Sequence, residues 1–244
     1  MKQNHNMTDM KREKREEIIG KNMTFELSEA FKLLRTNIAF SLPDDNECRV
    51  IGVVGAIRGI GKSFVAANLA YSFAGADKKV LLIDADLRMP TIAQKTGLVP
   101  APGLSNYLAG VGADSVEAIT QVFTKNMDVI TSGNIPPNPS ELLGSEKMRA
   151  LLSSLKQKYD YIIFDLPPIG VVSDALVVSK LVNGFLLVVR QNIDEKKSVQ
   201  EMMRQFDLVQ AKVLGFVFNA FEGGAKHYGK YKGGKYYRYY KREQ

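Results

Sequence analysis

Residues 49–63 read RVIGVVGAIRGIGKS, an apolar run that passes into a glycine-rich loop and ends in Lys62 and Ser63. The run predicts a strand over Arg49–Val54, and apolar positions at helical spacing predict a helix over Lys62–Ala76. The loop between them matches the phosphate-binding pattern G-x-x-x-x-G-K-[ST], except that Ala56 replaces the first glycine. The alternative is a glycine-rich turn before an ordinary helix, but the flanking strand and helix favour nucleotide binding.

This loop has the chemistry that a triphosphate requires. Successive backbone N–H groups and a helix N-terminus surround the β- and γ-phosphates, and Gly55, Gly59 and Gly61 provide a permissive backbone. Lys62 adds a positive charge, and the Ser63 hydroxyl is a ligand for Mg²⁺. The predicted nucleotide contacts therefore come from the loop and the start of its helix: Arg58, Gly59, Ile60, Gly61, Lys62, Ser63 and Phe64.

Short apolar runs alternate with helical patterns along the rest of the chain. Further strands are expected at 80–84, 127–131, 161–165, 185–189 and 214–219, and helices from residue 27 and near 104–108, 138–158, 174–181 and 195–210. Near-continuous apolar strands separated by helices indicate a mostly parallel sheet with helices on both faces. The predicted fold class is α/β of the P-loop NTPase type.

Acidic side chains end two of these strands, where ligands bind in open α/β sheets. Asp84 and Asp86 follow one apolar run, and Asp165 ends another. Each could cap a turn or helix, but with Lys62 and Ser63 they favour a metal–nucleotide site. We expect Asp165 to hold Mg²⁺ directly or through water and Asp84 and Asp86 to help. One of that pair would orient or deprotonate an acceptor, so Lys62 and the three acids form the predicted catalytic set.

Two further polar side chains have open interpretations. Asn219 ends the last predicted strand, where its amide could read the edge of an adenine or serve as a turn residue. Cys48 is the only cysteine, so no intrachain disulfide forms and a reducing compartment is expected. We interpret Cys48 as a small residue beside the first strand and not as a nucleophile.

The charge is concentrated at one end of the chain. The 244 residues carry a formal net charge of +7, from 33 basic and 26 acidic residues. Residues 225–244 hold seven of the basic residues and one acid, which leaves 26 basic and 25 acidic residues in 1–224. A uniformly basic nucleic-acid-binding face is therefore not indicated. The 45% hydrophobic content excludes a wholly disordered chain and a collagen-like fibre.

The composition divides the chain into a flexible arm (1–24), a P-loop domain (25–222) that opens with a helix at 25–41, and a flexible tail (223–244). The tail has no Leu, Ile, Val or Met, so it buries too little apolar area to offset its ordering entropy. No apolar run reaches the roughly 18–20 residues that span a bilayer, and the first residues lack the apolar core of an export signal. A cytoplasmic location is expected. The tail contains six of the ten tyrosines: Tyr228, Tyr231, Tyr236, Tyr237, Tyr239 and Tyr240.

Several motifs occur together in this chain. Besides Ala56–Ser63 they are LLIDADLR (81–88), GNIPPNPSELL (133–143), YIIFD (161–165) followed by PPIG (167–170), EAFKLLRTNI (29–38) and the tyrosine-rich end. Together they resemble the bacterial tyrosine kinases, or BY-kinases, of capsule and exopolysaccharide synthesis over about residues 26–244. The resemblance implies a P-loop kinase domain that uses ATP and Mg²⁺ to autophosphorylate the six tail tyrosines.

The resemblance also implies partners. It implies a ring-like homo-oligomer, a membrane-embedded activator of the chain-length-determinant type that recruits the kinase to the inner face of the membrane, and an opposing tyrosine phosphatase. The family's interface motif Glu-x-x-Arg-x-x-Arg corresponds to Glu29, Lys32 and Arg35 here. Lys32 keeps the charge of the middle position but loses its bidentate fork.

Two other functions compete with this one. Partitioning or Min-type ATPases share the acidic strand ends, but they carry a lysine where this loop has Ile57, and they lack a tyrosine cluster. A binding module could instead use the basic aromatic tail to stack on single-stranded nucleic acid. Because such a module needs neither the loop nor the acids, no nucleic-acid partner is expected.

The kinase interpretation, in contrast, uses the acids. A tyrosine hydroxyl, with an unperturbed pKa near ~10, needs a carboxylate to accept its proton.

Overall fold

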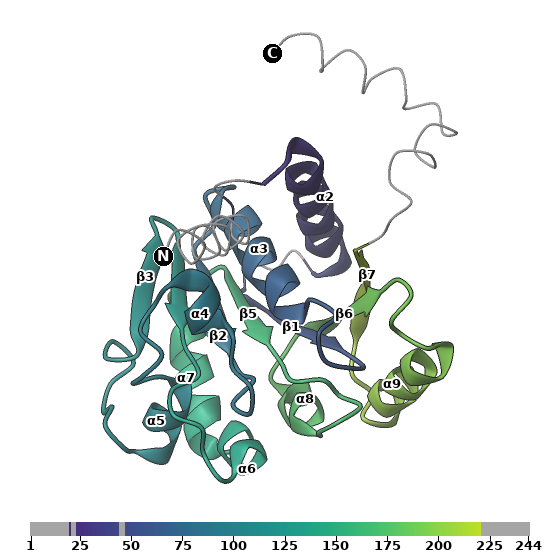
Figure 1. Ribbon diagram of the computed structural model, residues 1–244. Coiled ribbons are helices and arrows are strands. Elements are labelled where there is room, and N and C mark those ends of the chain that lie inside the picture. The colour runs from purple at the N-terminus through teal and green to yellow at the C-terminus, as the bar shows by residue number, and fades with distance from the viewer. Residues whose placement is uncertain (1–19, 21–22, 44–46, 221–244) are drawn as a thin grey trace, which may run out of the picture.

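The computed structural model describes Gly20, residues 23–43 and residues 47–220, and these form one layered α/β unit around a seven-stranded sheet (Figure 1). Its strand order is β3-β4-β2-β5-β1-β6-β7. All neighbouring strands pair in parallel except β3 with β4. The predicted α/β class with a mostly parallel sheet is confirmed. The strands are β1 (Arg49–Gly55), β2 (Val80–Asp84), β3 (Thr120–Thr124), β4 (Met127–Ile130), β5 (Tyr161–Asp165), β6 (Gly184–Arg190) and β7 (Val213–Asn219).

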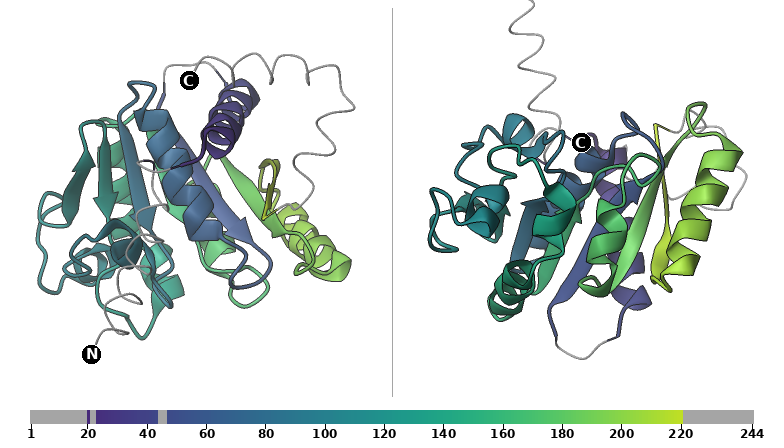
Figure 2. Two further views of the ribbon diagram at one scale, coloured as in Figure 1. Left: turned by 45° about the horizontal axis from the view of Figure 1, so that its top comes forward. Right: turned by 90° about the horizontal axis from the view of Figure 1, so that it is seen from below.

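Helices cover both faces of the sheet, as Figure 2 shows edge-on. One face packs on α2 (Phe25–Ser41) and α3 (Lys62–Ala74), with the start of α4 (Ile92–Thr96). The other packs on α5 (Leu104–Ala109), α6 (Pro139–Leu143), α7 (Glu146–Lys156), α8 (Asp174–Val177), the 3₁₀ turn η1 (Val178–Lys180) and α9 (Lys196–Leu208).

The sheet has an apolar core on each side, which explains why its strands are continuously apolar. In β1, Ile51 and Val53 face the α3 side, whereas Val50 and Val54 face the opposite core. All four are fully buried. Successive side chains of a strand point to opposite faces, so a strand covered on both faces loses the alternation of polar and apolar residues.

Several expected boundaries change because local contacts end the helices early. The helix expected over 138–158 is two helices, since the chain turns at Gly144 and Ser145 caps α7 by accepting from the Met148 N–H (Oγ to N 3.2 Å). The helix expected near 174–181 is the short α8 followed by η1. Strand β3 and helix α4 were not predicted, because β3 is a half-exposed edge strand and α4 has only five residues.

Helix α2 lies on α3 and leaves one side open to solvent. Phe31 and Ile38 are buried, whereas Ala30 is exposed. The N-cap is Thr24, whose hydroxyl accepts from the Leu27 N–H (3.3 Å), and Ser28, the other hydroxyl residue near this end, lies inside the helix.

The expected arm falls almost wholly, and the expected tail wholly, outside the described residues. Within the described part of the chain, no helix has the length and hydropathy needed to cross a membrane.

Candidate active site

The loop between β1 and α3 has the backbone geometry of a phosphate cradle. Gly59 and Gly61 adopt left-handed φ values of 74° and 96°, and Gly61 caps α3. These values favour glycine because a Cβ would be strained there. Ala56 has a negative φ, so the departure from the motif at this position causes no backbone strain.

Groups from distant parts of the chain donate hydrogen bonds to the backbone carbonyls of this loop. The Ile169 and Gly170 N–H groups donate to the carbonyls of Gly55 and Ala56, each at 3.1 Å. The Arg190 guanidinium, at the end of β6, donates to the Gly59 carbonyl at 3.1 Å. The loop is therefore anchored by the chain that follows β5 and by the end of β6.

Asn219 also contacts the cradle from the end of β7. Its Nδ2 donates to the Ile60 carbonyl at 2.7 Å, and a Cβ added to Gly61 would collide with that Nδ2. This contact positions the amide beside the nucleotide loop. That Asn219 reads an adenine edge stays a prediction.

Lys62 and Ser63 occupy the first turn of α3, where the helix N-terminus favours anions. Lys62 is only 8% exposed, and this burial lowers its pKa, while the carboxylates of Asp165 and Asp86 oppose the shift. A buried charge is unfavourable unless it is paired, so the Lys62 ammonium is suited to bind an anionic ligand.

Asp84 and Asp165 end adjacent parallel strands and face each other in register. Both are essentially fully buried. Burial raises the pKa of Asp84 well above its usual range, and the neighbouring Asp165 raises it further, although the Ile92 N–H donates to Asp84 Oδ2 at 3.0 Å. Burial likewise raises the pKa of Asp165 to about 7, opposed by the Ser63 hydroxyl and by Lys62.

Asp86 lies beyond the end of β2 and is half-buried. Its Oδ1 accepts from the backbone N–H groups of Arg88 (3.3 Å) and Met89 (3.0 Å), which closes a tight turn on the acid itself. The charge of Asp86 acts on Lys62, Asp84 and Asp165. The structure therefore brings the whole predicted catalytic set together at the carboxyl ends of β1, β2 and β5.

The donor set fits Mg²⁺ held together with a nucleotide. The Asp84 Oδ1 and both carboxylate oxygens of Asp165 are buried without a hydrogen bond of ordinary geometry. Within the described ranges, no three His, Cys, Asp or Glu side chains form a closed metal cage. Mg²⁺ needs none, since it usually keeps several waters and takes one or two carboxylates plus phosphate oxygens. Ser63, Asp84, Asp86 and Asp165 remain the predicted metal ligands.

The other predicted residues take varied positions. Arg58 is exposed at the tip of the loop. Ile60 is fully buried, and Phe64 packs edge-on against Phe31 of α2 (centroids 5.9 Å apart), so these two could offer only backbone to a nucleotide. The six tail tyrosines lie outside the described residues.

The predicted interface residues already make contacts within the protomer. Lys32 Nζ pairs with Glu29 Oε1 at 2.7 Å on the exposed face of α2. Arg35 is half-buried and donates to the Ser72 carbonyl of α3 at 2.6 Å. A role of these three in assembly stays a prediction.

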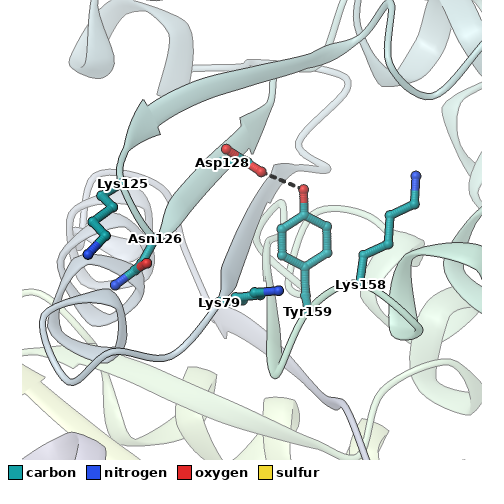
Figure 3. A pocket seen from close by; sticks show the side chains of 6 residues that line it. All are labelled: Lys79, Lys125, Asn126, Asp128, Lys158 and Tyr159. Atoms are coloured by element: carbon teal, nitrogen blue, oxygen red, sulfur yellow. Dashed lines mark hydrogen bonds between the residues drawn. The ribbon is translucent and has the colours of Figure 1, made fainter.

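A separate hollow of about 300 Å³ lies near the amino ends of β2, β4 and β5, at the opposite end of these strands from the candidate active site (Figure 3). It is lined by Lys79, Lys125, Asn126, Asp128, Lys158 and Tyr159. The Tyr159 hydroxyl donates to Asp128 at 2.7 Å, and Lys158 pairs with Glu117 at 3.0 Å. Its polar groups are thus largely satisfied, and it plays no part in the site at the carboxyl ends.

The lone cysteine is also remote from this chemistry. Burial raises the pKa of Cys48 to about 11. The thiol therefore stays protonated near neutral pH, which agrees with a small packing residue and not a nucleophile.

Sequence reasoning missed three residues that support the site, because each acts through a distant partner. Arg190 holds the cradle, while Asp174 and Ser140 hold Arg88, the residue next to the Asp86 turn. The only available signal was the position of Ser140 within the motif at 133–143 and of Asp174 shortly after that at 167–170, and Arg190 lies in neither.

Fold and site together define a P-loop protein that binds a nucleotide with Mg²⁺. The family model described as AAA domain matches residues 48–214. Tyrosine-protein kinase YwqD of Bacillus subtilis is 40% identical over 193 residues (79% of this chain and 80% of the relative), and tyrosine-protein kinase CpsD of Streptococcus agalactiae is 35% identical over 206 residues (83% and 87%). The chain belongs to the family of bacterial tyrosine-protein kinases.

Solved structures agree with this assignment. The chimerical protein CapA2B2 superposes with a TM-score of 0.75 at 34% identity, over 79% of this chain and 84% of that one. The cell division ATPase MinD of Pyrococcus furiosus has a lower TM-score of 0.60 at 28% identity, over 72% and 74%. This chain therefore shares its fold with both solved structures, and of these two the CapA2B2 chimera is the more similar in sequence and in structure.

Proposed function

We propose that this chain is an ATP-dependent autokinase that transfers the γ-phosphate to tyrosines of its own residues 223–244. The observation that carries the proposal is the meeting of Lys62, Ser63 and three carboxylates at one end of the sheet. Six tyrosines then follow the domain within one basic segment, which supplies the acceptor.

The two acids after β2 take different roles in this proposal. Asp84 is buried, and its Oδ2 is occupied by the Ile92 N–H. Asp86 is half-exposed beyond the strand end, where a phenol can reach it. Asp86 is thus the better acceptor for the tyrosine proton, whereas Asp84 suits a metal or its water.

In the proposed phosphoryl transfer, these side chains account for the bonds that form and break and for the proton that is released. The phenolic oxygen forms a bond to the γ-phosphorus as the bond to the β-phosphate oxygen breaks, and ADP leaves. The phenol's proton passes to the Asp86 carboxylate, while Lys62 and the loop N–H groups neutralise charge on the phosphates. Bound at Ser63 and the buried acids, Mg²⁺ would add charge neutralisation on the same oxygens.

The wider function follows the family resemblance. Phosphorylation in trans within a ring-like homo-oligomer would use Glu29, Lys32 and Arg35 at the interface. A membrane-embedded activator of the chain-length-determinant type would recruit the cytoplasmic kinase to the membrane, and a tyrosine phosphatase would reverse the modification. The output would be control of capsular or exopolysaccharide synthesis.

A Min-type ATPase without kinase activity is the second candidate, favoured only by the shared fold. Ile57 in place of a loop lysine and the tyrosine cluster count against it. The two candidates differ in their product, since the ATPase releases inorganic phosphate and leaves the chain unmodified.

The test is to incubate the full chain with Mg-ATP and map added phosphate by mass spectrometry. We expect phosphotyrosine confined to the tail in the wild type and none in Lys62→Met. Mixing Lys62→Met with a variant that carries Tyr→Phe at all six tail positions should label only the former if transfer occurs in trans. ATP hydrolysis without phosphotyrosine, even with the activator's cytoplasmic segment added, would favour the ATPase.

A further inference from the structure

A buried carboxylate joins three segments of the chain around the active site. Asp174 is completely buried, and both of its oxygens accept from Arg88: Nε to Oδ2 at 2.9 Å and Nη2 to Oδ1 at 3.0 Å. The Ser140 hydroxyl donates to the same Oδ1 at 2.6 Å and accepts from Arg88 Nη2 at 3.1 Å. We call Arg88, Asp174 and Ser140 the clamp.

The clamp joins segments that are far apart in the chain. Arg88 lies two residues beyond Asp86, Ser140 lies in the first turn of α6, and Asp174 begins α8. The sequence separations from Arg88 are 52 residues to Ser140 and 86 to Asp174. All three segments emerge near the end of the sheet that carries the site.

The clamp acts directly on the turn that contains Asp86. The backbone N–H of Arg88 donates to Asp86 Oδ1, as does that of Met89. Fixing the Arg88 side chain therefore fixes the backbone donors that orient the Asp86 carboxylate. A guanidinium fork on a carboxylate is a geometrically specific contact, and a buried carboxylate without its partner would be strongly unfavourable. The turn is consequently held in one arrangement.

We infer that Asp174 and Ser140 are positioning residues for the reaction, which act on the Asp86 carboxylate through the Arg88 side chain. The inference rests on the proposed kinase function. It assigns the segments around Ser140 and Asp174 a role in placing the proton acceptor, separate from nucleotide binding by the loop at 55–63.

Kinetics of the full-length chain separate positioning from folding. Asp174→Asn and Arg88→Lys should lower kcat for tail phosphorylation about 10- to 100-fold, and Ser140→Ala about 3- to 10-fold. The KM for Mg-ATP should change much less than kcat, since the nucleotide loop and the other predicted metal ligands, Ser63, Asp84 and Asp165, are untouched. Because Asp174→Asn could fail to fold, Ser140→Ala, which removes only a partly buried hydroxyl, carries the test alone if needed.

Matched controls alter the same chemistry elsewhere. Ser145→Ala removes the cap of α7, and Arg204→Lys breaks an exposed fork to Glu201 (2.8 and 2.9 Å) on α9. Both should leave kcat within about twofold even where thermal stability falls. Equal loss of kcat in the Ser145→Ala and Ser140→Ala variants would overturn the inference, because the effect would then be general destabilisation.

Amide hydrogen exchange provides a readout that does not require catalysis. In the clamp variants the amides of Arg88 and Met89 should exchange at least about tenfold faster, while those of β2 and α3 stay protected. If the wild type makes no phosphotyrosine, the proposed function fails, and this exchange result still decides whether the clamp orders the Asp86 turn. Unchanged exchange, or unchanged kcat in all three clamp variants of an active kinase, would overturn the inference.

Discussion

Asp84 and Asp165 are register partners at the ends of two hydrogen-bonded parallel strands, β2 and β5, and both side chains are buried. Burial raises the pKa of each, and mutual repulsion adds to the shift of Asp84. Two neighbouring buried acids do not both ionise readily, so without a bound cation the pair holds its protons to a higher pH than the same acids do in the unfolded chain. We expect this pair to contribute to the pH dependence of stability in the metal-free protein.

Metal-free stability should fall as the pH rises. The pKa of Asp165 is about 7 in the folded chain against an ordinary 3.8, so the folded state binds more protons than the unfolded state between these values. The stabilisation is complete below pH ~4 and disappears as the pH rises through 7. Asp165→Asn, a neutral mimic, should raise Tm at pH 8 by several degrees, at about 2–4 °C per kcal/mol.

Thermal unfolding in EDTA at pH 5.5 and pH 8 measures this effect. Asp128→Asn serves as the control, since that acid lies in the hollow at the opposite end of the strands. A wild-type Tm that falls no more over this range than that of Asp165→Asn, or a lower Tm for Asp165→Asn than for the wild type at pH 8, would contradict the raised pKa of Asp165, whereas Asp128→Asn should show the wild-type fall.

The two left-handed glycines of the loop should differ in their tolerance of alanine. Gly61→Ala combines backbone strain with a collision against Asn219, whereas a Cβ at Gly59 meets nothing within 4 Å. We expect Gly59→Ala to cost about 1–2 kcal/mol and Gly61→Ala more, with loss of ATP-analogue binding. Denaturant unfolding and fluorescent-nucleotide titration measure both quantities. Removing the amide in Gly61→Ala/Asn219→Ala should recover part of the loss, and equal damage by the two single variants would contradict the model of the collision.

A pair of substitutions tests which residue caps the N-terminus of α2. Thr24→Ala removes the hydroxyl that accepts from Leu27 and should destabilise the helix by about 1 kcal/mol. Ser28→Ala lies inside the helix and should change stability by less than about 0.5 kcal/mol. Amide exchange across residues 25–41 compares the two. Faster exchange in the Ser28→Ala variant alone would show that Ser28, and not Thr24, caps the helix.

Self-association tests the proposed interface. Lys32→Arg introduces the bidentate fork that the family motif carries at this position, so we expect assembly to tighten several-fold. Sedimentation velocity of the full chain over a concentration series measures the change, with Lys197→Arg on the exposed side of α9 as the matched control. If both variants associate equally strongly, residue 32 does not lie in the interface.

Local patterns in the chain were sufficient to predict the layered sheet and the chemistry of its edge. The strand bounds of β2 and β5 agree with expectation at both ends, because a buried parallel strand is a short apolar run, and in each of these two the first acid, itself buried, is the last residue of the strand. The Gly-Lys-Ser loop is equally local, since the φ values of Gly59 and Gly61 and the helix N-terminus that binds phosphate lie within a few consecutive residues.

Contacts between distant segments were decided only when the chain folded. No local pattern distinguishes Asp174 from any other helix-starting acid, or predicts that Asn219 contacts the loop at Ile60. Strand β3 has half-exposed residues and obtains its place from pairing with β4. Propensity and periodicity report on neighbours along the chain, whereas the pKa values of Asp84 and Asp165 and the orientation of Asp86 depend on burial and on partners up to 86 residues away.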